Sequence, residues 1–149
     1  MVRDRLISAI LGLGLALAAT TAQAGAEGDY VLRCSGCHRM GGAGSARGGV
    51  PDLRGSVSSF AQSEAGRRYL MHVPGVTTSG LDDADIAAVM NYVMDRWGAE
   101  SHSDDVAAFT AAEVAALRAE PVDNVVRFRR TVVKDLRARD LPVAAYPWP

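Results

Sequence analysis

The sequence predicts an all-α protein, and two observations carry that prediction. Apolar residues recur every three or four positions between Leu81 and Trp97, which is the period of a helix with one buried face. Two further helical stretches follow Ala99, and strands do not alternate with the helices as they would in an α/β fold. The chain has 149 residues, enough for one domain with extensions but too few to favour two domains.

The N-terminus has the features of a secretory signal peptide. Arg3 and Arg5 precede an apolar run over residues 6–19, and Ala22-Gln23-Ala24 has the small-x-small pattern that signal peptidase recognises. An uncleaved membrane anchor is the alternative, but the run is shorter than the ~20 apolar residues that a span needs. We therefore predict a cleaved signal over residues 1–24 and a soluble mature chain in the periplasm.

The charge balance argues against a nucleic-acid partner. The chain has 16 Lys and Arg against 17 Asp and Glu, a formal net charge of -1. No basic stripe with interleaved aromatic residues occurs in the first hundred residues. We therefore expect no binding to nucleic acid.

A helix is expected over residues 26–33, and it runs into the only two cysteines of the chain, in Cys34-Ser35-Gly36-Cys37-His38. A redox disulfide is one alternative, but a redox CxxC normally opens a helix that follows a strand. A four-ligand zinc site is another, but no histidine repeats a metal-ligand spacing with the thiols. Covalent haem attachment uses all three side chains, two thiols as thioethers and the imidazole as an iron ligand. We therefore predict one haem c with its iron, attached through Cys34 and Cys37 and ligated by His38.

Glycines dominate residues 41–49, which predicts a loop whose backbone can pass close to a flat ligand. The loop leads to Pro51, whose carbonyl could accept a hydrogen bond from the outer nitrogen of a ligating histidine. A plain turn proline is the alternative reading of this residue.

The next elements are a helix over residues 58–70, weakened in its middle by Gly66, and a second loop over residues 71–80, which cannot be helical beyond its first residues. Pro74 predicts that loop because it disfavours helix at the residue before it. The strongest helix of the chain then begins near Leu81, with aspartates in its first turn, and ends at Gly98.

The chain from Ala99 onward predicts two more helices and a proline-rich end. Thr110 and Glu113 form a capping box before the first of these helices. The second is basic, with six Arg and Lys residues between Arg127 and Arg139 and an apolar side formed by valines and Leu136.

Together these residues resemble a class I cytochrome c, the family of small all-α electron carriers with one haem. The match covers residues 28–97, from Tyr30 and the CxxCH motif through Pro51-Asp52-Leu53-Arg54-Gly55 to Asn91-Tyr92 in the last helix. The resemblance implies that Pro51 accepts a hydrogen bond from His38, that Leu53 packs on the haem, and that the first and last helices cross. It gives a haem domain over residues 25–98 and a helical C-terminal extension over residues 99–149, which does not resemble the family.

The sixth iron ligand departs from the family pattern. Many members place a Met-Pro dipeptide in the loop before the last helix, and this sequence has none. Met71 lies in the right region and is the predicted ligand, with His72 as the alternative and an open site as a third possibility. A thioether raises the reduction potential and a second imidazole lowers it.

These features predict a periplasmic carrier, not an enzyme, that passes one electron between a dehydrogenase and an acceptor such as an oxidase or another cytochrome. One alternative is a cytochrome subunit bound stably to a single oxidoreductase, with the extension as a clasp and Tyr146 and Trp148 as interface anchors. A third alternative is a five-coordinate haem acting as a peroxidase or a gas sensor.

Overall fold

The computed structural model describes residues 25–145, so the predicted signal peptide and the predicted anchors Tyr146 and Trp148 lie outside the described residues. Within that range the regular secondary structure is helical, apart from one isolated antiparallel bridge between Ser45 and Val50. This confirms the all-α fold class. None of the helices between residues 25 and 145 is long and apolar enough to cross a membrane.

The first helical segment runs from Gly25 into the cysteine motif, as predicted. Its middle is a π-helical turn, η1 (Tyr30–Cys34), in which the Ser35 N–H donates to the carbonyl of Tyr30, and α2 (Ser35–His38) continues from it. The apolar pattern of this stretch contains no signal for that extra residue in the turn. Single π-turns inside helices are frequent at functional sites.

The middle of the chain holds two helices instead of the single one predicted for residues 58–70. They are α3 (Val57–Ala61) and α4 (Glu64–His72). The Ser63 hydroxyl caps α4 by accepting a hydrogen bond from the Gly66 N–H at 3.1 Å. Gly66 does not mark a weak point, because a Cβ there would collide with the Phe60 carbonyl. It therefore allows α3 and α4 to pack closely.

The loop predicted over residues 71–80 is shorter than expected. Helix α4 continues to His72, and Pro74 begins a one-turn helix, α5 (Pro74–Thr77). The prediction was correct that Pro74 ends the preceding helix and wrong that the following residues are irregular. A proline at the first helical position costs no hydrogen bond, since that N–H has no partner within the helix.

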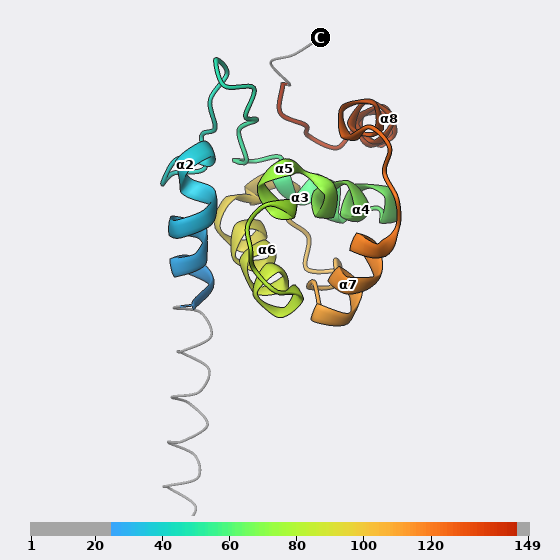
Figure 1. The fold of residues 1–149 in the computed structure, drawn as a ribbon. Coiled ribbons are helices and arrows are strands. Elements are labelled where there is room, and N and C mark those ends of the chain that lie inside the picture. The colour runs from blue at the N-terminus through green and yellow to red at the C-terminus, as the bar shows by residue number, and fades with distance from the viewer. Residues whose placement is uncertain (1–24, 146–149) are drawn as a thin grey trace, which may run out of the picture.

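Helix α6 (Asp83–Trp97) matches its prediction, with Asp82 as N-cap accepting from the Asp85 N–H at 2.9 Å. The first and last helices of the haem domain meet through aromatic rings, because the Tyr30 ring lies 4.6 Å from Trp97 and 5.9 Å from Tyr92 between centroids. The predicted packing of these two helices against each other is therefore present, and Figure 1 shows them side by side.

The C-terminal extension forms η2 (Ala99–Ser101), α7 (Ala111–Ala119) and α8 (Val125–Ala138). Thr110 caps α7 as predicted by accepting from the Glu113 N–H. The Glu113 carboxylate does not complete the capping box. It pairs instead with both Nε and Nη2 of Arg67 on α4, the latter at 2.7 Å.

This extension packs on the haem domain rather than standing away from it (Figure 1). Helix α7 lies against α4 and α6, and α8 lies against α3 and α4. The extension contributes buried apolar side chains to the same core cluster as Tyr30, namely Phe109, Val114, Leu117, Val132, Val133 and Leu136. One hydrophobic core therefore crosses the predicted boundary at Ala99.

Candidate cofactor site

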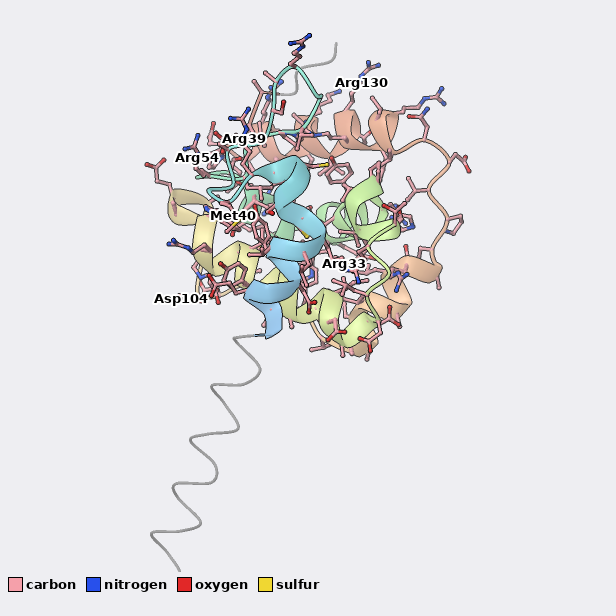
Figure 2. All side chains as sticks on the ribbon, turned by 60° about the vertical axis from the view of Figure 1, so that its left-hand side comes forward. Arg33, Arg39, Met40, Arg54, Asp104 and Arg130 are labelled. Atoms are coloured by element: carbon pink, nitrogen blue, oxygen red, sulfur yellow. The ribbon has the colours of Figure 1, made fainter. Side chains whose placement is uncertain are left out.

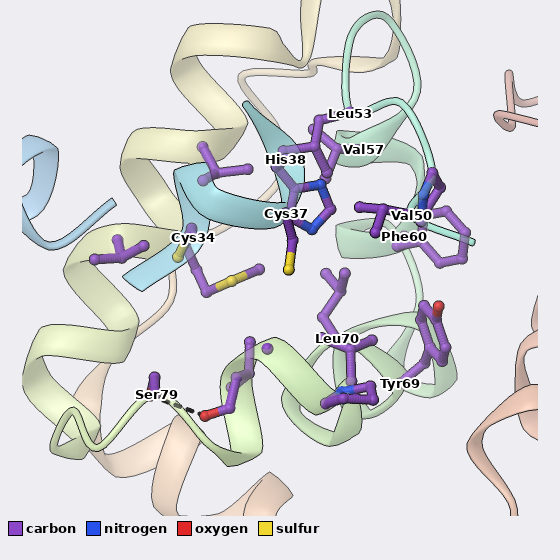
Figure 3. A pocket seen from close by; sticks show the side chains of 18 of the residues that line it. Cys34, Cys37, His38, Val50, Leu53, Val57, Phe60, Tyr69, Leu70 and Ser79 are labelled. Atoms are coloured by element: carbon purple, nitrogen blue, oxygen red, sulfur yellow. Dashed lines mark hydrogen bonds between the residues drawn. The ribbon is translucent and has the colours of Figure 1, made fainter. Parts of the chain in front are cut away.

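A cavity of about 450 Å³ lies between α2, α4 and α6, and its size is within the range of about 300–1,000 Å³ that cofactors and ligands occupy. All three motif side chains, Cys34, Cys37 and His38, reach its wall, as do Pro51 and Leu53. Figure 3 shows His38 and the two cysteines on one side, with Leu53, Val57 and Phe60 beside them and Leu70 and Tyr69 on α4. The remaining lining is largely aliphatic.

Helical spacing places the motif side chains together. Cys37 and His38 follow Cys34 by three and four residues, which puts all three on one side of a helical segment. The two thiols are free and do not form a disulfide. Burial raises the pKa of the Cys34 thiol, and Asp29 and Cys37 add to the effect. A redox-active cysteine pair needs a lowered pKa, so this environment argues against the redox alternative.

The His38 imidazole has the properties that an iron ligand requires. Burial lowers its pKa, and the nearby Pro51 carbonyl opposes that effect. The neutral ring is the form that binds metals. Its Nδ1 is buried and has no hydrogen-bond partner that meets the geometric criteria within the described part of the chain. The structure therefore places His38 near the Pro51 carbonyl but does not form the predicted hydrogen bond between them. A metal at Nε2 would fix Nδ1 as the donor.

The glycine-rich loop folds back so that its start packs closely against the backbone of Val50 and Pro51, which fixes the position of Pro51. Gly44 has a φ of +61°, and a Cβ on it would collide with the carbonyl oxygens of Val50 and Pro51. Ser45 and Val50 exchange two backbone hydrogen bonds of 2.8 and 2.9 Å, and the Leu53 N–H donates to Gly42 at 2.9 Å. The loop therefore presents Pro51 and Leu53 to the cavity.

The structure does not bring Met71 to the cavity. Tyr69, Leu70 and Val73 line it from α4 and the residue after that helix. Successive helix residues are rotated by about 100°, so Met71 points to nearly the opposite side of α4. It is fully buried in the core cluster, with 0% of its surface exposed. Ligation by Met71 stays a prediction, and it would require the end of α4 to unwind.

His72 is also absent from the residues that line the cavity. Its Nδ1 lies 2.8 Å from the Arg68 carbonyl, one turn earlier in α4. The thioether that does line the cavity is Met90 of α6, which belongs to the apolar positions that predict the buried face of this helix. Met90 is 7% exposed and belongs to both the core and the cavity wall. Helix periodicity shows that a residue is on the buried face, but not whether it faces a cavity or solid packing.

Sequence reasoning also missed the contribution of the extension to this site. Val125, Val126 and Arg129 of α8 line the cavity, together with Ala144. The signal was available, because Arg129 occupies a position in the apolar stripe of α8, three and four residues before Val132 and Val133. A charged residue inside a buried stripe is an informative exception to the helix pattern.

A small helical fold with a CxxCH motif on the wall of an apolar cavity defines a c-type cytochrome, and the comparisons agree. The family model for cytochrome c matches residues 22–97. A cytochrome c-552 of Thermus thermophilus is 35% identical over 138 residues, covering 80% of this chain and 88% of that protein. A second cytochrome c-552 of the same species is 34% identical over 106 residues, covering 59% of this chain and 80% of that protein. The chain belongs to the cytochrome c family, as a class I c-type cytochrome and an electron-transfer haem protein.

The first relative also bears on the extension. Its match covers 80% of this chain, more than residues 1–97 contain, so similarity extends beyond the haem domain into the extension. The cofactor of the family is covalently bound haem c. When bound, it supplies an iron that changes between the ferric and ferrous states by one electron. The thiols, the neutral imidazole and the aliphatic walls of the cavity fit this group.

Proposed function

We propose that this protein is a periplasmic one-electron carrier, without catalytic activity of its own, that connects a dehydrogenase to an oxidase or another cytochrome. The observation that carries the proposal is the convergence of two free thiols and a half-buried imidazole, with its pKa lowered by burial, on one largely apolar cavity. The periplasmic location rests on the signal features of residues 1–24.

In this proposal each site residue has a distinct task. Cys34 and Cys37 would attach a single haem, and His38 would bind its iron. The Pro51 carbonyl would accept from Nδ1 of His38 and keep the ring in one orientation. Leu53 would cover the haem and exclude water, which together with the axial ligands sets the reduction potential.

The surface around the motif suits brief encounters with other proteins. Leu32 and Met40 are 77% and 65% exposed, and they lie within a few residues of Cys37. Arg33 directly follows Leu32 and Arg39 directly precedes Met40, and both arginines are exposed. Figure 2 shows Arg39 and Met40 to the left of the first helical segment and Arg33 to its right. Weak electron-transfer complexes use small interfaces, and charges increase their rate of formation. A redox partner with an acidic docking surface fits this face.

The alternative of a stably bound subunit loses part of its support. Its clasp would use the apolar side of α8, but Val132, Val133 and Leu136 are buried in the chain's own core. A stable partner would have to bind the exposed basic side of that helix.

A potentiometric titration of the purified protein, combined with a peroxidase assay, tests the proposal. We expect one reversible transition that fits a single electron, and no turnover of hydrogen peroxide above that of free haem. Sustained peroxide turnover by the native protein would replace the carrier with the five-coordinate haem enzyme. The absence of a reversible transition would refute the carrier.

A further inference from the structure

The C-terminal extension places a cation in the wall of the haem cavity. Arg129, in the middle of α8, is only 5% exposed and lines the cavity with Val125 and Val126 of the same helix. The other arginine on the wall, Arg33, is exposed at the surface. Arg129 is therefore the buried guanidinium that a molecule filling this cavity would meet.

Among the contacts of the guanidinium, two are with residues of the cavity wall. Its Cζ lies 5.4 Å from the centroid of the Phe60 ring, which itself lines the cavity, and its Nη2 donates a long hydrogen bond of 3.4 Å to the Ala144 carbonyl. The first is a cation–π contact and the second is a bond to a neutral acceptor. Both contacts hold the side chain against the cavity.

The haem assigned to this cavity carries two propionate carboxylates. Arginine is the side chain best suited to bind a carboxylate, because its planar fork donates two parallel hydrogen bonds. Such a pair is stronger in a buried site than at the surface. We propose that Arg129 binds a haem propionate, so that the C-terminal extension is part of the cofactor site and raises the reduction potential. This rests on the proposed haem carrier.

The expected effect follows from electrostatics. A fixed positive charge beside the haem favours the ferrous state, whose iron carries one positive charge less, and it keeps the propionate ionised. Without that charge the potential should fall at neutral pH. The propionate should then protonate at a higher pH, by roughly one pKa unit or more, and the potential should depend on pH in that range.

Other ionisable groups on the cavity wall could also produce a pH dependence. In the described part of the chain they are Tyr30, Arg33, Cys34, Cys37, His38, Asp52 and Tyr69. The Asp52 carboxylate pairs with Arg54 at 2.6 Å, which holds its pKa below the usual range. All of them remain in a variant that changes Arg129 alone, so a difference between that variant and the native protein reports Arg129.

The test is the midpoint potential as a function of pH in the full-length haem protein. We compare Arg129→Gln and Arg129→Lys with Arg127→Gln, a matched control that removes an exposed charge from the same helix. We expect Arg129→Gln to lower the potential at neutral pH and to move the pH-dependent segment upward. Arg129→Lys should keep most of the native potential, and Arg127→Gln should match the native protein.

Equal curves for Arg129→Gln and Arg127→Gln would overturn the proposal. If Arg129→Gln does not yield folded haem protein, the comparison of Arg129→Lys with an uncharged variant decides. Lysine keeps a cation beside the propionate, so the proposal requires a higher potential in Arg129→Lys than in the uncharged variant. Equal potentials in the two would overturn the proposal. Arg129→Met, which keeps the apolar stem, supplies that uncharged reference. If the native protein shows a one-electron transition and the Arg129 variants have the native potential, only this inference is refuted. If the native protein contains no haem, the proposed function is refuted.

Discussion

Replacing Leu136 by Ala should destabilise the whole protein, although this residue lies far along the extension. Leu136 is on α8 with 0% of its surface exposed, within the same core cluster as Tyr30 and Met71 of the haem domain. The substitution removes three carbon groups at about 0.8 kcal/mol each, or roughly 2.4 kcal/mol. The cavity left behind raises the loss to about 3–4 kcal/mol.

The assay is urea unfolding of the haem-bearing protein, followed by circular dichroism. Leu32→Ala is the matched control, because it deletes the same atoms from a helical leucine that is 77% exposed, and it should change the free energy of unfolding by at most about 0.5 kcal/mol. Typical domains have only about 5–15 kcal/mol of stability, so the difference is easily measured. If Leu136→Ala costs no more than Leu32→Ala, the extension is not part of the core and the account of it is wrong.

Three further predictions follow from the same structure. Truncation after Trp97 removes the buried side chains of α7 and α8, so we expect loss of folded haem protein; a stable truncated protein, seen by gel filtration and circular dichroism, would favour the independent domain and the clasp. Helix α4 turns Met71 away from the cavity, so Met71→Leu should leave the ferric absorption spectrum and the potential unchanged; altered values for Met71→Leu, with none for Met90→Leu, would restore the ligand predicted from the sequence. Burial raises the pKa of Tyr30 to about 12, and its hydroxyl donates to the Arg39 carbonyl at 2.7 Å. The folded state therefore holds this proton more tightly than the unfolded chain, so stability should fall as pH rises from about 10 to about 12. Tyr30→Phe should remove that loss, and an equally steep loss in Tyr30→Phe would assign it to other groups.

The parts of this site that the sequence predicts are those that lie close together along the chain. Cys34, Cys37 and His38 share a helical segment, so their spacing alone sets their common direction. Pro51 follows a loop whose length and glycines bring it back to the motif. In both cases local geometry is sufficient, and the structure places these residues on one cavity.

The parts that it does not predict depend on where helices end and how they are rotated. Position along the chain put Met71 near the expected ligand loop, but α4 continues through His72 and thereby fixes the direction of Met71. The sequence shows Arg129 as one of six cations on a basic helix, and only the packing of α8 on α3 and α4 reveals that its side chain is buried. Both outcomes are set by tertiary contacts.

The central claim is that one haem is bound covalently through Cys34 and Cys37, and intact mass spectrometry under denaturing conditions tests it most directly. We predict that the purified mature chain carries the added mass of one haem, which remains after extraction with acidified acetone. The double variant Cys34→Ser, Cys37→Ser should carry none. A native chain with the mass of the polypeptide alone, or a double variant that keeps the haem, would contradict the claim.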